Sequence, residues 1–185
     1  MQFTRKALIW ALLAVIIGFT WYTEALQTDS GKNAHQPTVS KISKKSVCGA
    51  NLQLSISEKP GLVRFARNKG LRYPEAFANT VAHIRLRHRL PDCYVTKSQA
   101  RSRGWTPGHS LWKVSPGSSI GGDRFGNREN RLPRTNNGHY IEADIDYDGR
   151  QRGAHRLVFA KTTGSAAPPV WLTTDHYRHF SRVPE

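Results

Sequence analysis

Apolar residues at helical spacing stand out in the middle of the chain. Phe77, Val81 and Ile84 follow one another at intervals of four and three residues, which places them on one face of an α-helix. Pro74 is typical of a first helical turn, and the basic run at 85–89 suits the negative end of a helix. We therefore predict a helix that begins at Pro74 and ends in that basic run.

A second helix is predicted just downstream. The segment from Thr96 to Gln99 has the pattern of a capping box, in which the two terminal side chains bond to each other's backbone, and Gly104 follows as a stop signal. Lys97 falls in the first turn, where a cation opposes the helix dipole. This position indicates an anion site at the free helical amides, and a solvated lysine is the alternative.

Strand signals follow the two helices. Residues Tyr140 to Tyr147 alternate between an apolar face and a polar face, and Glu142 lies on the polar one. Two further runs, His155 to Thr162 and Val170 to Thr174, are rich in β-branched and aromatic residues. Helices that precede strands indicate an α+β fold, with N-terminal helices packed on one face of a C-terminal antiparallel sheet. We expect the other face to be polar and open.

The N-terminus has the pattern of a targeting segment. Arg5 and Lys6 precede an apolar run, and a helix from Ala7 to Tyr22 would be about 24 Å long, short of the roughly 30 Å hydrocarbon core of a membrane. That length suits a signal peptide over residues 1–25, and an uncleaved signal-anchor is the alternative. The polar residues 26–47 are typical of a linker.

Residues 48–72 contain no motif. Their apolar side chains could pack on either side of a predicted turn at Lys59, Pro60 and Gly61. The chain has two cysteines, Cys48 and Cys93, and an exported protein would meet an oxidising compartment. We therefore predict a disulfide between them, with two unpaired buried thiols as the alternative.

The net charge of the chain indicates which partners it binds. The formal net charge is +15, more than solubility alone requires, so the chain is expected to bind polyanions such as RNA; a solubilising surface charge is the alternative. The acidic run Asp144, Asp146 and Asp148 resembles the start of a calcium-binding loop. Such a loop needs a bidentate glutamate at its twelfth position, where this chain has His155, so we do not expect a calcium site. No cysteine and histidine spacing suits zinc.

Four segments, read in order, resemble the barnase-like family of guanyl-preferring microbial ribonucleases. The segments are Leu90–Ser98 (LPDCYVTKS), Ser119–Glu129 (SIGGDRFGNRE), Glu142–Tyr147 (EADIDY) and Thr173–Tyr177 (TTDHY). The similarity extends over about 73–183, and residues 73–185 are therefore predicted to form a ribonuclease domain. Residues 48–72 have no counterpart in the small members of the family and are an extension of unclear role.

The resemblance implies a metal-free and cofactor-free reaction. Glu142 would be the general base and His176 the general acid, and RNA would be cleaved through a 2′,3′-cyclic phosphate. Lys97, Arg152 and Arg156 would stabilise the phosphate in the transition state. Guanine would be bound by Phe125, Gly126, Asn127, Arg128, Glu129 and Tyr177.

Gly126 stands where the family has a serine, which bears on the strength of the guanine preference. The prediction is an exported, monomeric endoribonuclease that cleaves single-stranded RNA, preferentially after G. It would contact a membrane only if the N-terminal segment stays attached. An antibacterial ribonuclease toxin with a cognate, acidic, barstar-like inhibitor is an alternative, as is a basic RNA-binding module that has lost catalysis.

Overall fold

The computed structural model describes residues 46–135, 138–161 and 166–185. The predicted targeting segment at 1–25, and the linker up to residue 45, lie outside the described residues. Among the residues described, no helix combines the length and the apolar character needed to cross a membrane.

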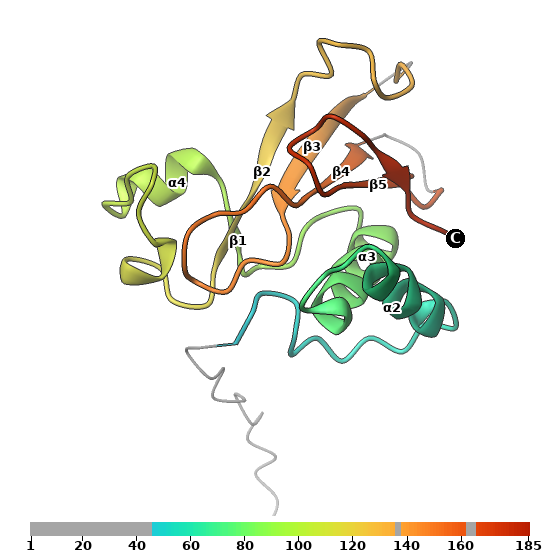
Figure 1. Cartoon of the computed structure of the whole chain (residues 1–185), viewed down its shortest axis with the longest axis horizontal. Coiled ribbons are helices and arrows are strands. Elements are labelled where there is room, and N and C mark those ends of the chain that lie inside the picture. Colours follow the sequence, from blue (N-terminus) through green and yellow to red (C-terminus); the bar gives the residue numbers. More distant parts are fainter. Residues whose placement is uncertain (1–45, 136–137, 162–165) are drawn as a thin grey trace, which may run out of the picture. The chain divides into compact units, whose positions relative to one another are not determined.

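Helices come first along the chain and most of the strands come later, as Figure 1 shows. The helices are α2 (Lys59–Asn68), α3 (Pro74–Arg87), α4 (Lys97–Ser102) and the short 3-10 helix η1 (Leu111–Lys113). The strands are β1 (Tyr94–Val95), β2 (Ser119–Phe125), β3 (His139–Asp144), β4 (Arg156–Lys161), β5 (Val170–Thr173) and β6 (Ser181–Arg182).

The six strands that the structure describes form one sheet in the order β1-β2-β3-β4-β5-β6. Among the strands of the described residues, β1 and β2 pair in parallel and the other neighbours are antiparallel. The predicted α+β class is therefore confirmed. The sequence signals had indicated β3, β4 and β5 but not β1, β2 or β6.

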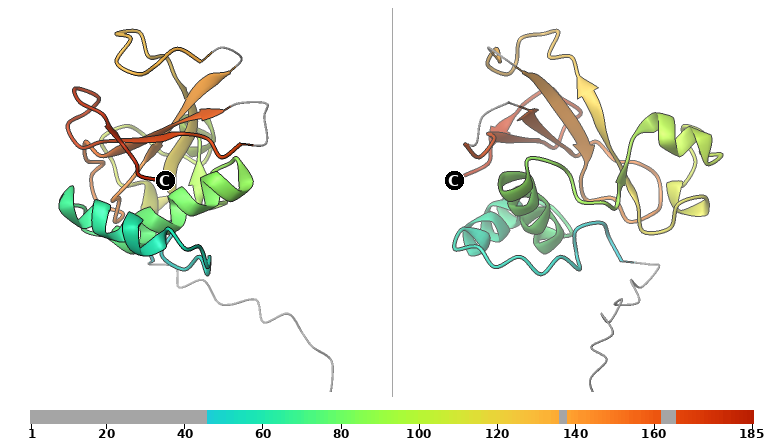
Figure 2. Two further views of the ribbon diagram at one scale, coloured as in Figure 1. Left: turned by 90° about the vertical axis from the view of Figure 1, so that its right-hand side faces the viewer. Right: turned by 180° about the vertical axis from the view of Figure 1, so that it is seen from behind.

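Helices α2 and α3 lie together against one face of the sheet (Figure 2). The predicted helix at Pro74 is confirmed, and its Phe77, Val81 and Ile84 are completely buried. The predicted turn at Lys59–Gly61 is wrong. Pro60 instead occupies the first turn of α2, where a missing N–H costs no hydrogen bond.

The expectation of an open polar sheet face is wrong in part. A second apolar cluster covers much of that face; it consists of Leu132, Tyr140, Val158, Ala160 and Trp171, with Phe125, Tyr177 and Phe180 packed on it. Asp144 and Asp146, placed on the polar side of the strand pattern, are also buried. Polar strand residues can be buried here because cationic side chains pair with them.

The extension is joined to the domain by covalent and polar contacts. Cys48 and Cys93 form a disulfide, as predicted, with a Cα–Cα distance of 5.6 Å. The Asn79 side chain donates to the carbonyl oxygen of Gly49 at 2.9 Å. At the other end of the extension, Arg72 donates to Asp146 Oδ2 at 3.2 Å and to Asp148 Oδ2 at 2.8 Å. The extension is thus held at both of its ends.

Candidate active site

Glu142 lies in the middle of β3 with both carboxylate oxygens engaged. Its side chain is 12% exposed. The Nζ of Lys97 donates to Oε1 at 2.5 Å, and the hydroxyl of Tyr177 donates to Oε2 at 2.7 Å. The three side chains come from β3, from the start of α4 and from the segment after β5, so the fold brings together residues far apart in the sequence.

The backbone at the start of α4 fixes the position of Lys97. The predicted capping box is confirmed: Thr96 and Gln99 bond to each other's backbone N–H groups. The Lys97 amide donates to Asp123 Oδ2 at 2.9 Å. The sequence predicted that the amides at the start of this helix are free to bind an anion. This prediction is wrong for the Lys97 amide, because the Asp123 carboxylate already accepts its hydrogen bond.

Asp123 reaches this position through an irregularity in β2. The pairing register with β3 shifts between Gly121 and Asp123, which places Asp123 opposite Glu142. Gly122 lies within the shift with a φ of +100°, a conformation that glycine adopts without strain. The glycine pair of the Ser119–Glu129 segment thus serves the geometry of the site, and sequence reasoning had assigned no role to Asp123.

Arg152 and Arg156 converge on one buried carboxylate, that of Asp144. Arg152 forms two bonds to it, from Nε at 2.5 Å and from Nη2 at 2.7 Å, and the Nε of Arg156 lies 2.9 Å from Oδ1. Burial opposes the charge of Arg152, but the hydrogen bonds and the negative charge of Asp144 outweigh burial and raise the pKa of the guanidinium. Asp144 thus holds both guanidinium groups close to Glu142, two residues before it on the strand.

Asp144 was not among the predicted site residues. Its signal in the sequence is its place two residues after Glu142, on the same side of the strand alternation. The predicted site did not include an acidic residue that pairs with both arginines. The structure indicates that such a residue is needed, because the buried Arg156 and the half-buried Arg152 would otherwise repel each other.

His176 and Tyr177 follow β5 in a tight turn. Both adopt left-handed backbone conformations, with φ of +60° and +71°. The Tyr177 amide donates to the side-chain oxygen of Thr173 at 2.9 Å, which anchors the turn to the end of the strand. The exposed His176 ring lies 5.3 Å from the Tyr177 ring, centroid to centroid. The histidine is therefore next to the residue whose hydroxyl contacts Glu142.

Tyr177 was expected to stack on a base. Its ring is stacked on that of Phe125 with 5.2 Å between the centroids, and its hydroxyl contacts Glu142. Burial, followed by the hydrogen bond to Glu142, raises the pKa of the Tyr177 hydroxyl. The tyrosine therefore stays protonated and can donate to the carboxylate.

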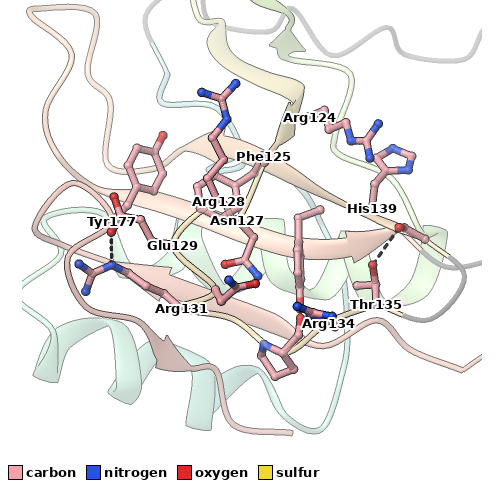
Figure 3. A pocket seen from close by; sticks show the side chains of 15 residues that line it. Arg124, Phe125, Asn127, Arg128, Glu129, Arg131, Arg134, Thr135, His139 and Tyr177 are labelled. Atoms are coloured by element: carbon pink, nitrogen blue, oxygen red, sulfur yellow. Dashed lines mark hydrogen bonds and ion pairs between the residues drawn. The ribbon is translucent and has the colours of Figure 1, made fainter.

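The predicted guanine loop lines a cleft of about 760 Å³ (Figure 3). Asn127 stabilises the loop, since its side chain exchanges hydrogen bonds with the backbone of Leu132 at 2.8 and 3.0 Å. Glu129 is exposed and pairs with Arg131 at 2.6 Å. Phe125, Gly126, Asn127, Arg128, Glu129 and Tyr177 all line this cleft.

Gly126 is not required by steric constraints. A Cβ at this position would lie 3.5 Å from the Arg128 side chain, an ordinary contact distance. A serine would therefore fit here. The glycine removes a side-chain hydroxyl from the loop, and the backbone conformation does not require it.

Among the described residues, no group of three or more His, Cys, Asp or Glu side chains is arranged to hold a metal ion. The Asp144, Asp146 and Asp148 carboxylates, which resembled a calcium loop in the sequence, bind arginine side chains.

Comparison with known proteins assigns the chain to a family. Residues 77–184 match the family model described as ribonuclease. The chain is 48% identical over 96 residues to the ribonuclease of Heyndrickxia coagulans, a match that covers 51% of this chain and 84% of that protein. The ribonucleases of Bacillus intermedius and Bacillus pumilus show the same identity over 96 residues, and the match spans 56% of each. The chain thus belongs to the ribonuclease family, as its resemblance to the barnase-like microbial enzymes predicted, and it is an RNA-cleaving enzyme.

Proposed function

We propose that the chain is an exported endoribonuclease that cleaves single-stranded RNA, preferentially after G, by metal-independent transesterification. The proposal rests on the residues that surround Glu142. The carboxylate lies between a lysine and a tyrosine, two residues from the Asp144 carboxylate that fixes two arginines, and a histidine adjoins the tyrosine. These are the groups that a base, an acid and an anion-binding site require.

Glu142 acts first in the proposed mechanism. Its carboxylate removes the proton of the ribose 2′-hydroxyl, and the 2′-oxygen then attacks the adjacent phosphorus. His176 donates a proton to the departing 5′-oxygen. The bond between phosphorus and the 5′-oxygen breaks, which yields a 2′,3′-cyclic phosphate and a 5′-hydroxyl. In the slower hydrolysis of the cyclic product, His176 removes a proton from water and Glu142 returns one to the 2′-oxygen.

Three cations stabilise the phosphorane-like transition state. Lys97, Arg152 and Arg156 are positioned before substrate binds, so little reorganisation is needed when negative charge develops on the phosphoryl oxygens. The Lys97 ammonium can exchange its contact with Glu142 for one with the phosphate. That exchange leaves one oxygen of Glu142 free to accept the 2′-hydroxyl proton.

The loop beside Phe125 would select the base. The carboxylate of Glu129 can accept the N–H donors on the Watson–Crick edge of guanine, and the amides of Gly126, Asn127 and Arg128 would bind the guanine oxygen. The rings of Phe125 and Tyr177 offer an apolar surface on which a base can stack.

The Cys48–Cys93 disulfide supports export, because such bonds persist in oxidising compartments. The predicted signal peptide or signal-anchor would direct the chain there. The cationic centre would also suit an acidic, barstar-like inhibitor, and the enzyme is expected to act as a monomer without a cofactor.

Substitution of the acid and the base tests the mechanism. We expect Glu142→Ala and His176→Gln each to lower the rate of RNA transesterification by at least about a hundredfold, the usual contribution of such groups, while thermal unfolding shows that both variants are folded. Glu75→Ala on α3 and His109→Gln in the loop before η1 are matched controls that should keep the rate, because both side chains are exposed and pair with Arg67 and Thr106, not with Glu142 or His176. Near-normal cleavage by Glu142→Ala would remove this residue from the role of base. Activity that disappears in EDTA and returns with a divalent ion would contradict the metal-free reaction.

A further inference from the structure

The cleft that contains the predicted guanine loop continues beyond that loop. Arg124 near the end of β2, His139 at the start of β3 and Arg134 in the connection between them also line it. Figure 3 shows Arg124 and His139 at the opposite end of the cleft from Tyr177, whose hydroxyl contacts Glu142. The cleft thus has one end at Tyr177, which contacts the candidate catalytic carboxylate, and another end at a wall formed by Arg124, Arg134 and His139.

The sheet register supports this separation. Arg124 pairs with Ile141, and His139 precedes Ile141 by two residues, so the Arg124 and His139 side chains lie on the same face of the hairpin, opposite to that of Glu142. Along β3, His139 lies three residues from Glu142, a distance of roughly 10 Å. A strand of RNA that leaves the guanine loop would pass around the end of the hairpin to reach this wall.

The charges of this wall are not compensated. Within the described parts of the chain, the side chains of Arg124 and Arg134 have no hydrogen-bond or ion-pair partner, whereas Arg152 and Arg156 share the carboxylate of Asp144. Glu129 is the one carboxylate among the described lining residues, and it already pairs with Arg131. Free arginines around an open cleft produce a positive potential that attracts a polyanion, and the guanidinium geometry matches a phosphate.

The chemistry of the proposed reaction decides which part of the RNA would lie here. Cleavage after G places the 3′-phosphate of the guanosine at Glu142, so the 5′-phosphate leaves the nucleoside in the other direction. We propose that Arg124, Arg134 and His139 form a subsite for the RNA backbone on the 5′ side of the guanosine. This inference rests on the proposed function, because it uses the direction in which the substrate lies in the cleft.

Short chimeric substrates test the subsite. Each is a deoxyoligonucleotide with a single riboguanosine, so only one bond can react. One substrate begins at the riboguanosine, and the other has two additional deoxynucleotides on its 5′ side. We expect the 5′ nucleotides to raise kcat/KM of the purified chain about tenfold, as one or two arginine–phosphate contacts would. In the double variant Arg124→Ser/Arg134→Ser, most of that gain should disappear.

A matched loss of charge serves as the control. Arg64 on α2 and Arg87 on α3 are exposed and have no ion-pair partner among the described residues. Arg64→Ser/Arg87→Ser therefore removes the same charge from the helix layer, and it should keep the full gain. The subsite is refuted if the 5′ nucleotides give the original chain no advantage, or if Arg124→Ser/Arg134→Ser keeps the gain.

A binding measurement separates failure of the subsite from failure of the proposed function. If neither substrate is cleaved, the proposed reaction is wrong, and the same two sequences made entirely of deoxynucleotides still test the wall by fluorescence anisotropy. The longer probe should bind more tightly to the original chain, with an affinity that decreases more steeply with salt, by a slope of about 0.7 per phosphate contacted. Equal affinities for the two probes, or a difference that persists in Arg124→Ser/Arg134→Ser, would overturn the proposal.

Discussion

Removal of the Cys48–Cys93 disulfide should destabilise the enzyme with little effect on its chemistry. The two cysteines are separated by 45 residues in the sequence. In the chain-entropy account, a cross-link that closes a loop of this size lowers the entropy of the unfolded chain enough to stabilise the fold by about 4 kcal/mol. For the variant Cys48→Ala/Cys93→Ala we therefore expect the free energy of unfolding to decrease by about 3–4 kcal/mol.

Activity should change much less than stability. Cys93 directly precedes β1, and the helix with Lys97 follows it, but the pairing of β1 with β2 and the Thr96–Gln99 capping box hold this segment by contacts that do not involve the cysteines. At a temperature where the variant is folded, kcat/KM for RNA should stay within about threefold of the original value. The extension then acts as a brace for the fold and not as a part of the reaction.

Equilibrium unfolding in urea measures the effect. With a slope of about 2 kcal/mol per molar urea, the midpoint should fall by about 2 M, and the slope should increase because the unfolded chain without its cross-link exposes more surface. The original chain treated with a reductant should behave like the variant. A loss below about 1 kcal/mol would refute the reasoning, as would a folded variant whose kcat/KM falls a hundredfold.

Three further predictions concern the acidic residues around the site. Asp144→Asn should lower the free energy of unfolding in urea by about 3–5 kcal/mol, because the buried Arg156 and the half-buried Arg152 lose their partner; a loss below about 1 kcal/mol would contradict the pairing. Arg72→Ala should cost about 1–2 kcal/mol in the same measurement, since the buried Asp146 carboxylate loses a charged donor, and an unchanged midpoint would show that the contact contributes nothing. The backbone and ring N–H groups of His179 hold the pKa of Asp175 below its usual value of 3.8, so this carboxylate stabilises the fold above that pH and ceases to do so as the pH falls further. The urea midpoint should therefore decrease between pH 5 and pH 2, and Asp175→Asn should show a weaker pH dependence than the original chain; equal pH profiles would exclude the effect.

Short sequence patterns predicted the helices and strands that depend on interactions between residues close together in the sequence. The spacing of Phe77, Val81 and Ile84 gave the course of α3, and the capping box of Thr96 gave the start of α4. Alternation gave β3, although the strand ends at Asp144 and not at Tyr147. There Asp146 turns into a left-handed conformation, and its carboxylate pairs with Arg72, a residue 74 positions away.

The elements that local patterns did not predict depend on distant partners. Strands β1 and β6 have two residues each, and they exist only because β2 and β5 offer free edges. Strand β2 contains glycines and a register shift, so it lacks the regular alternation of a strand. The same reason explains the site residues that were missed, since Asp123 and Asp144 take part through contacts that the fold creates.

The most direct test of the central claim, that Glu142 and His176 catalyse metal-free transesterification after G, is to map the ends that the purified chain leaves on a defined single-stranded RNA in EDTA. The account predicts 3′ ends that fall on guanosine and carry a 2′,3′-cyclic phosphate, opposite 5′-hydroxyl ends. Fragments with 3′-hydroxyl and 5′-phosphate ends would contradict it, because a reaction that uses the 2′-oxygen as its nucleophile cannot produce them.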